Sequence, residues 1–442
     1  VSVLYWEARR AMGAFRFIVS FAWLAVLWGL CAPDGIITGT AAMRVDEVQC
    51  DMFSAGSPQN ATMHSGTLYV FRSCVLTDTN LTAVVRDSGR ASGGGVHVLW
   101  DNMTLTGGHF EFLGDGEAND GSVTNLNLTV QNSHVATRYG AFVVVAHDRV
   151  ENVSMTVRNA TVSATAGYAL TIASRRSSPN GTMLTIRDVS IALDDRAVAW
   201  SAVPRGTTPL FEYDVSEASA VAIVPSSSVR LNVTNYAVDV ANRSAVAAGD
   251  SSDTERALAA GSVRVLAIGA STLRKVTVTV RDGSSVSATA RTAAAAAGWW
   301  SEGAGVVVAL HGTTVAVMNG SSLNVTSTAN TAAPVLAGAV AAINGSHTSA
   351  ADMRLAADGG AVIGVDVRRN VTAAALFGAV SDVAFAAVNV TVWRSAVSNG
   401  SVAGAVMGNA PGGAGGVHTL GFGANTDGLL SIDDAITSVT AG

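Results

Sequence analysis

Aromatic and charged side chains are scarce in this sequence. They account for 6% and 14% of the 442 residues, and Ala, Val, Gly, Ser and Thr take their place. Small and β-branched side chains suit stacked strands better than helix bundles, so the composition argues against an α-helical protein. The hydrophobic content of 49% still suffices for a sizeable core, which excludes general disorder.

Basic stripes and enzyme motifs are also absent. Lys275 is the only lysine, the arginines are scattered and the net charge is -6, so we expect no nucleic-acid partner. The eight histidines are isolated, and the chain contains no HExxH, GxSxG or P-loop sequence. We therefore predict no catalytic residue, no metal site and no cofactor, and we do not expect an enzyme.

Only three cysteines occur, at positions 31, 50 and 74. If Cys31 is removed with an N-terminal leader, Cys50 and Cys74 remain as a pair in an oxidising compartment. A bond between them is worth roughly 3 kcal/mol in the chain-entropy model, and we predict that disulfide. No histidine lies at ligand spacing from either cysteine, which argues against zinc.

Residues 1–32 have the features of a secretory signal. Arginines, the last at Arg16, precede an uncharged run from Phe17 to Ala32, and Pro33 stops it. The run is short for a membrane span of about 20 residues, so we predict a signal peptide, with an uncleaved signal anchor as the alternative. Either reading sends residues 33–442 into the secretory pathway, to the cell surface or the medium.

A repeat of about 30 residues runs through the rest of the chain. Residues 125–135 read NLNLTVQNSHV and residues 152–162 read NVSMTVRNATV, with aliphatic residues alternating before a polar one. Alternation with period two is a strand signal. The residue two before the polar one recurs at positions 71, 100, 130, 157, 186, 233, 280, 317 and 387, and the first four intervals are 29, 30, 27 and 29.

This spacing predicts an all-β fold, a right-handed parallel β-helix with coils of about 27–30 residues and longer loop insertions in the second half. A second aliphatic run in each unit, such as AFVVVA at 141–146, indicates two or three strands per coil. Residues 291–300 are the one stretch that could be helical, and PGGAGG at 411–416 is a loop. The period-2 pattern excludes helical solenoids, and the constant spacing argues against propellers and sandwich arrays.

Stacking predicts dry interior columns, one of them made of Val130, Val157 and Ile186. The polar residue of each unit has the parity of the inward residues, so we expect a corner ladder of side-chain hydrogen bonds between coils. The predicted ladder consists of Asn102, Asn132, Asn159, Asp188, Asn235, Asp282, Asn319 and Asn389.

Fifteen of the 22 asparagines stand in N-x-S/T sequences, which behind a secretory signal predicts heavy N-glycosylation. Alternation directs Asn127, Asn152 and Asn232 outward, and we expect high occupancy there and little on the ladder. The predicted acceptors are Asn60, Asn80, Asn127, Asn152, Asn180, Asn232, Asn242, Asn324, Asn344, Asn370 and Asn399.

Two acidic stretches offer weaker enzyme or metal readings. Asp427 and Asp433 lie in ANTDGLLSIDDAI at 424–436, and similar carboxylates act as acid and base in polygalacturonase-type hydrolases. In those enzymes the two carboxylates should fall on successive coils, whereas Asp427 and Asp433 are only six residues apart. GDGEANDG at 114–121 has three spaced oxygen ligands of a calcium loop, Asp115, Glu117 and Asn119, without its glycine and its bidentate glutamate. A solvated turn fits that stretch better.

Two segments carry a family resemblance. Residues 7–66 read EARRAMGAFRFIVSFAWLAVLWGLCAPDGIITGTAAMRVDEVQCDMFSAGSPQNATMHSG, and residues 93–116 read GGGVHVLWDNMTLTGGHFEFLGDG. They resemble the N-terminal region of the trypanosomatid dispersed gene family of surface proteins, and the resemblance extends over the whole chain. It implies a β-helical or adhesin-like ectodomain, and membrane association is implied by the family alone.

From these observations we expect a glycosylated cell-surface or secreted protein of adhesion or host interaction, with an unidentified host-cell or matrix ligand. The alternatives are a polysaccharide-active, pectin-lyase-like enzyme and a truncated, pseudogene-like product. The last reading rests on a start at Val1 without Met and an end at Gly442 without the family's membrane-spanning tail.

Overall fold

The computed structural model divides the chain into two units, Val1–Ala42 and Met43–Gly442. The predicted signal segment and Cys31 lie outside the described residues, as does the loop at 411–416. The structure describes residues 43–50, 58–86, 94–115, 121–203, 213, 215, 217–249, 254–291, 293–327, 335–344, 347–367, 371–379, 383–393, 396–399, 427–433 and 436–439.

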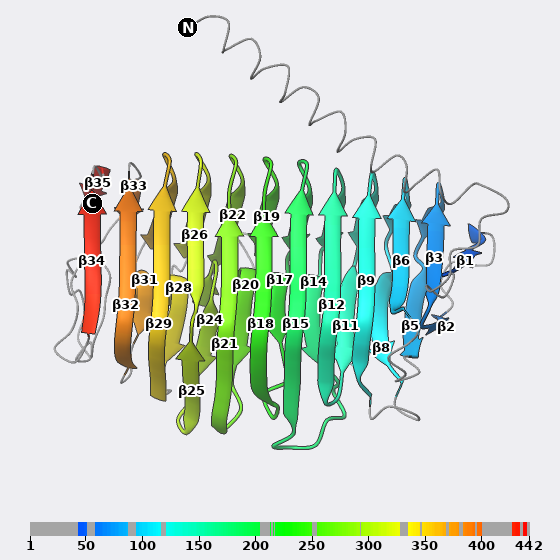
Figure 1. Cartoon of the computed structure of the whole chain (residues 1–442), viewed down its shortest axis with the longest axis horizontal. Coiled ribbons are helices and arrows are strands. Elements are labelled where there is room, and N and C mark those ends of the chain that lie inside the picture. Colours follow the sequence, from blue (N-terminus) through cyan, green and yellow to red (C-terminus); the bar gives the residue numbers. More distant parts are fainter. Residues whose placement is uncertain are drawn as a thin grey trace, which may run out of the picture. The chain divides into compact units, whose positions relative to one another are not determined.

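The described residues form strands and turns, without an α-helix, and the strands make three parallel sheets, here called A, B and C (Figure 1). Sheet A contains β1 (Arg44–Glu47), β3 (Thr67–Arg72), β6 (Val96–Asp101), β9 (Val123–Gln131), β12 (Arg149–Arg158), β15 (Met183–Asp194), β18 (Arg230–Val240), β21 (Gly269–Val280), β25 (Val306–His311), β26 (Thr314–Met318), β29 (His347–Asp358), β32 (Val383–Trp393) and β34 (Asp427–Asp433).

Sheet B contains β2 (Pro58–His64), β5 (Asn80–Arg86), β8 (His109–Gly114), β11 (Phe142–Ala146), β14 (Tyr168–Ser174), β17 (Ala218–Val224), β20 (Arg256–Val265), β23 (Ala293–Ala295), β24 (Trp299–Glu302), β28 (Val335–Asn344) and β31 (Val371–Ala379). Sheet C contains β4 (Val75–Thr77), β7 (Thr104–Thr106), β10 (His134–Thr137), β13 (Thr161–Ala164), β16 (Val198–Ser201), β19 (Ala245–Ala248), β22 (Ser285–Ala290), β27 (Ser322–Ser327), β30 (Val362–Val367), β33 (Ala396–Asn399) and β35 (Ile436–Val439).

The chain visits the three sheets in rotation. β9 lies in sheet A, β10 in sheet C and β11 in sheet B, and each then pairs in parallel with the strand one unit later, β12, β13 and β14. The prediction of an all-β fold with parallel strands is confirmed. The expectation of a helix at 291–300 is wrong, because this stretch continues sheet B as β23 and β24, where burial of Trp299 and Trp300 outweighs the helix preference of alanine.

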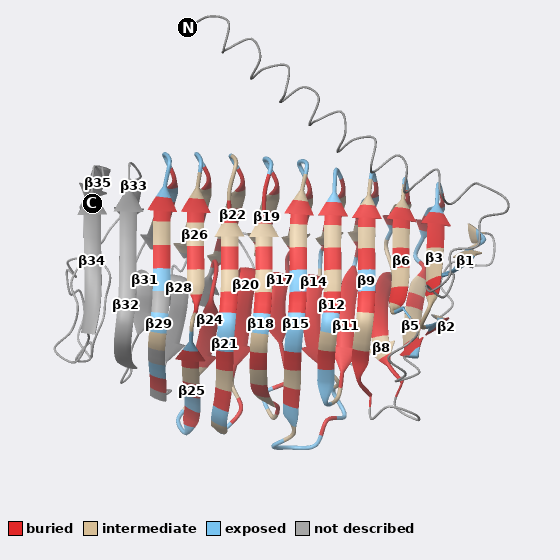
Figure 2. Ribbon diagram, in the orientation of Figure 1, coloured by how far each residue is buried: buried red, intermediate tan, exposed pale blue. Residues whose placement is uncertain are grey.

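The core is made of columns of equivalent side chains from successive units. Trp100 pairs with Val130 and Val130 with Val157, and all three are fully buried. Sheet A alternates buried and open positions, whereas every residue of β11, β14 and β17 in sheet B is buried (Figure 2). Sheet C alternates in the same way, so the open faces that strand alternation creates belong to sheets A and C and not to the middle of sheet B.

The predicted column of Val130, Val157 and Ile186 is correct for its first two members and wrong for the third. Val157 pairs with Leu193, 36 residues later, and Ile186 pairs with Val150. The chain from 175 to 182 lengthens this unit before β15 begins, and β15 carries the same alternation in both of its halves. Alternation alone cannot distinguish those halves, because buried residues stand at every second position both before Asp188, at Leu184 and Ile186, and after it, at Val189, Ile191 and Leu193.

Candidate functional site

A ladder of hydrogen-bonded side chains runs along the turn between sheets A and C. Its members share a left-handed backbone, with φ between 43° and 60°, in which Asn and Asp are the best tolerated non-glycine residues. Asn159 Nδ2 donates to Asn132 Oδ1 at 3.0 Å, and Asn319 Nδ2 donates to Asp282 Oδ1 at 2.9 Å. We call this set the corner ladder: Asn102, Asn132, Asn159, Asn242, Asp282 and Asn319.

The corner ladder faces solvent, so the expectation that its side chains point inward is wrong. Asn102, Asn132 and Asn159 are exposed, and Asp282 is half-buried. A left-handed residue interrupts the strand, and the alternation that predicts an inward side chain ends there. The inward place passes to the next residue in the first three units, and to the residue two positions on after Asn242, Asp282 and Asn319.

A second ladder interrupts the strands of sheet A half-way along their length. Asn152 Nδ2 donates to Asn125 Oδ1 at 2.7 Å, and Asn235 Nδ2 donates to Asp188 Oδ1 at 2.6 Å. Asp188 and Asn235 were predicted for the corner and belong to this set instead. We call it the kink ladder, and its members with positive φ are Asn125, Asn152, Asp188, Asn235, Lys275 and Asp352.

Asn389 lies on neither ladder, so the prediction that it belongs to the corner ladder is wrong. Its backbone pairs with Arg354 in the middle of β32, in a row of the sheet that Thr314 and Thr277 continue. The repeat had been aligned to the wrong half of a long strand, as at Ile186.

A column of buried serines lies directly inside the corner ladder, and sequence reasoning missed it. Ser244 N donates to Ser284 Oγ and Ser284 N donates to Ser321 Oγ, both at 3.1 Å, and Met103 N donates to Ser133 Oγ at 3.0 Å. Each hydroxyl satisfies a buried backbone N–H of the preceding unit. The sequence does contain a signal for this column, because a serine recurs one or two positions after the left-handed Asn or Asp in several units.

This serine column changes the meaning of two glycosylation sequences. Ser244 and Ser321 are the hydroxyl residues of the N-x-S sequences at Asn242 and Asn319, and both serines are buried. The corner therefore requires Asn and Ser at this spacing for its own hydrogen bonds. Part of the excess of N-x-S/T sequences follows from the fold.

The predicted acceptors differ in exposure. Asn370 lies outside the described residues, and Asn344 and Asn399 end β28 and β33. The half-buried acceptors are Asn80, Asn232 and Asn324, and the exposed ones are Asn60, Asn127, Asn152, Asn180 and Asn242. Of the exposed five, Asn152 and Asn242 belong to ladders, which leaves Asn60, Asn127 and Asn180 with exposed amides and no ladder hydrogen bond.

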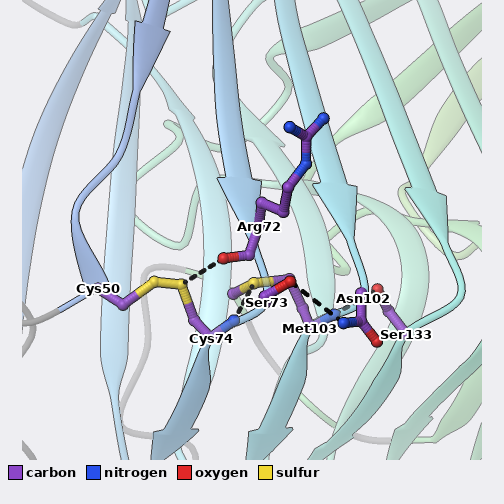
Figure 3. The surroundings of a disulfide bond; sticks show 7 residues. All are labelled: Cys50, Arg72, Ser73, Cys74, Asn102, Met103 and Ser133. Carbon is purple, nitrogen blue, oxygen red and sulfur yellow. Dashed lines mark hydrogen bonds between the residues drawn. A yellow bond between two sulfur atoms is a disulfide. The ribbon is translucent and has the colours of Figure 1, made fainter.

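Cys50 and Cys74, the predicted pair, form a disulfide between the turn after β1 and the start of β4 (Figure 3). Their Cα atoms are 5.8 Å apart, within the range that a disulfide spans. Met103 of the next unit lies beside the bond, and its Sδ accepts a hydrogen bond of 3.3 Å from Cys74 N. The disulfide thus ties the first strand of sheet A to the first of sheet C.

The acidic candidates do not converge on a site. Asp115 is buried and pairs with Arg86 at 2.8 Å, while Glu117 and Asn119 lie outside the described residues. Asp427 and Asp433 stand at opposite ends of β34. Among the described residues no group of three His, Cys, Asp or Glu side chains is placed to hold a metal ion.

Sheet B carries a belt of buried polar side chains instead. Thr82 Oγ1 donates to Glu111 Oε1 at 2.8 Å, and His109 Nε2 lies 3.9 Å from the same oxygen. Tyr213 comes from the chain between β16 and β17, and its pKa is raised well above the usual range by burial and then by the charge of Glu111. Its phenol therefore stays protonated at physiological pH.

A buried ion pair continues the belt. Arg264 Nη1 lies 2.7 Å from Glu217 Oε1, and the Tyr168 hydroxyl donates to that oxygen at 3.4 Å. Tyr213 stacks on Tyr168 with ring centroids 5.5 Å apart. These contacts hold the chain just before β17 against sheet B. Glu217 and Arg264 bind each other inside the protein and do not line an open cleft.

No family model, curated protein or solved structure matches this chain. Within the described ranges, no helix is long and apolar enough to cross a membrane.

Proposed function

We propose that the chain folds as a right-handed parallel β-helix and acts as a glycosylated, cell-surface or secreted protein of adhesion or host contact. The rotation of the chain through sheets A, C and B, with each unit paired to the next, supports the β-helix. The apolar run from Phe17 to Ala32 supports secretion.

The exposed acceptors outside the ladders carry the glycoprotein part of the proposal. Asn60, Asn127 and Asn180 stand in N-x-T sequences, are exposed, and belong to three different units. Their side-chain amides are open to modification because they make no ladder bond. Glycans at these three positions would leave the other rows of sheet A uncovered, so that a partner could bind there.

A rigid stack suits adhesion for a physical reason. Each row of sheet A repeats one polar position at the strand spacing of about 4.8 Å, so the binding groups are ordered before a ligand arrives. A long ligand then engages several units at once, and the individual contacts add through effective concentration.

A polysaccharide-active enzyme is the second candidate, and Glu111 is the observation that favours it. The side chain is 4% exposed, and its Oε2 has no hydrogen-bond partner among the described residues. An acid of this kind beside His109 is a candidate general acid or base. Cleavage of uronate polymers that is lost in Glu111→Gln or Asp427→Asn would support this function.

The test of the leading proposal is expression of the whole chain in a eukaryotic secretory host. We expect a product whose electrophoretic mobility increases after removal of N-glycans, and which binds to host cells or extracellular matrix. A matched variant with Asn60, Asn127 and Asn180 changed to Gln should lose most of that mobility shift. An unglycosylated product that stays in the cytosol would contradict secretion, and a secreted product that binds neither surface would contradict adhesion.

A further inference from the structure

Four cationic or imidazole side chains lie on the open face of sheet A. They belong to β21, β25 and β29, which are neighbouring strands (Figure 1). Arg274 pairs in register with His311, and Lys275 follows Arg274 on the kink ladder. Arg354 lies in the adjoining row, where it pairs with Thr314. All four side chains are exposed, and we call them the cationic patch.

The charges of the cationic patch are not neutralised by the described part of the protein. Elsewhere on sheet A, Arg281 lies 2.9 Å from an oxygen of Asp239, and Arg158 lies 3.9 Å from one of Asp194. Arg274, Lys275, His311 and Arg354 make no ion pair or side-chain hydrogen bond with any described residue. The patch is thus locally positive on a chain whose net charge is -6.

Two acidic groups share the column of Lys275, and each lies two strands away: Asp188, with Asn235 between, and Asp352 on the other side. Asp352 is an exposed member of the kink ladder, and Gly312 stands between the two units. Two strand spacings, roughly 10 Å, therefore separate the backbone of Lys275 from that of either acid, which is beyond direct pairing and about one screening length at physiological salt. An anion on the patch keeps its attraction to the nearer Arg274 and Lys275.

We infer that the cationic patch binds a linear anionic polysaccharide, with carboxylate or sulfate groups, laid across the strands. This inference rests on the proposed extracellular function and names the chemistry of its ligand. Strand spacing sets Arg274, His311 and the strand of Arg354 one after another at about 4.8 Å, which is close to the length of one sugar residue in an extended chain. Guanidinium groups bind carboxylates and sulfates through paired N–H donors.

The neighbouring side chains favour a sugar over a nucleic acid. The rows around the patch present hydroxyl groups from Thr234, Thr277 and Thr314, all of them partly exposed. Hydroxyls exchange hydrogen bonds with sugar hydroxyls, whereas single-stranded nucleic acids are held by aromatic side chains that stack on bases. The described neighbours of the patch on β18, β21 and β26 offer no exposed aromatic ring.

The experiment measures binding of heparin, chondroitin sulfate, uncharged dextran and single-stranded DNA to the full secreted chain on a biosensor surface. The test variant combines Arg274→Gln, Lys275→Gln and Arg354→Gln. Glutamine is used at 275 because asparagine before Val276 and Thr277 would create a new glycosylation sequence. The control variant combines Arg196→Gln and Arg243→Gln, which removes two exposed arginines at the corner between sheets A and C.

We expect heparin or chondroitin sulfate to bind, dextran not to bind, and affinity to fall as salt is raised. The test variant should bind at least about tenfold more weakly, which corresponds to 1.4 kcal/mol, while the control variant binds like the unaltered chain. Equal loss in both variants, no loss in the test variant, or equally tight binding of single-stranded DNA would overturn the inference. Retained adhesion to cells by a test variant that no longer binds heparin would reject the patch as the adhesive site without rejecting the proposed function.

The half-buried Asn232 needs one further control, because it pairs in register with Thr272, one row from Arg274. A glycan on Asn232 would lie beside the patch. Binding is therefore measured before and after enzymatic removal of N-glycans, and the difference between test and control variants should persist in both. A difference that disappears on deglycosylation would mean that glycans, and not the patch, carry the interaction.

Discussion

Asn159 Nδ2 donates a hydrogen bond of 3.0 Å to Asn132 Oδ1, and the two residues are 27 positions apart in the chain. The bond joins equivalent corners of successive units, and the backbone of each partner is left-handed. One residue type thus meets two demands of the corner, a positive φ and a bond to the neighbouring unit.

Asn159→Ala should lower the free energy of unfolding by about 1–3 kcal/mol, because it removes a hydrogen bond and places a β-carbon at positive φ. Asn159→Gly keeps the backbone conformation and should cost only the hydrogen bond, about 1 kcal/mol. Urea denaturation of both variants separates the two causes. Equal losses in Ala and Gly would show that the backbone conformation contributes nothing.

Ser284→Ala tests the buried serine column. The substitution removes the 3.1 Å hydrogen bond from Ser244 N to Ser284 Oγ and leaves that N–H with its 3.2 Å bond to Ala241 O, so we expect a loss of about 1 kcal/mol. Ser287→Ala, on the open face of the same strand β22, is the matched control and should change stability by no more than about 0.5 kcal/mol. Similar effects of both substitutions on the urea midpoint would refute the role of the column.

The ion pair of Glu217 and Arg264 is suited to a double-mutant cycle. Arg264→Met removes the cation beside the buried carboxylate of Glu217 and should destabilise the fold by about 3–5 kcal/mol. Adding Glu217→Leu should recover much of that loss, since the uncompensated charge is removed with it. Additive losses in the double variant would mean that the two side chains act independently.

Glycopeptide mapping of the secreted chain distinguishes the two kinds of N-x-S/T sequence. Asn60, Asn127 and Asn180 should be occupied, whereas Asn159 and Asn319 should be largely empty because their Nδ2 atoms donate ladder bonds. Asn152, predicted from alternation to be occupied, should also be largely empty, since its Nδ2 binds Asn125. Full occupancy of the ladder asparagines would mean that these bonds do not form in the secreted protein.

The sequence predicts the pairing of successive units well where those units have the same number of residues. Val130 and Val157 were placed correctly because only short turns join the strands of those units, and the spacing of 27 is unambiguous. Ile186 was misplaced because the insertion at 175–182 changes the length of the unit, while the alternation in β15 looks the same on both sides of Asp188. The sequence also predicts that a ladder exists. It does not show that there are two ladders, because the two halves of each long strand carry the same alternation.

The belt on sheet B was not predictable from the sequence. Glu217 and Arg264 are 47 residues apart and belong to no motif, and their contact forms only when β17 and β20 pair in sheet B. The burial of Ser244 and Ser284 was not predictable for a different reason. A serine after a turn residue resembles an ordinary surface turn, and its burial is visible only once the adjacent unit is in place.

Disulfide trapping of the strand register tests the central claim, that the units stack in parallel with the observed pairing. Thr156 pairs with Ala192, so cysteines introduced at these two open positions should lie about 5 Å apart and form a disulfide during secretion. A constant repeat of 29 residues would instead place Thr156 over Thr185. Mass spectrometry of unreduced peptides should find the bridge in Thr156→Cys/Ala192→Cys and not in Thr156→Cys/Thr185→Cys, and the opposite result would contradict the stacking described.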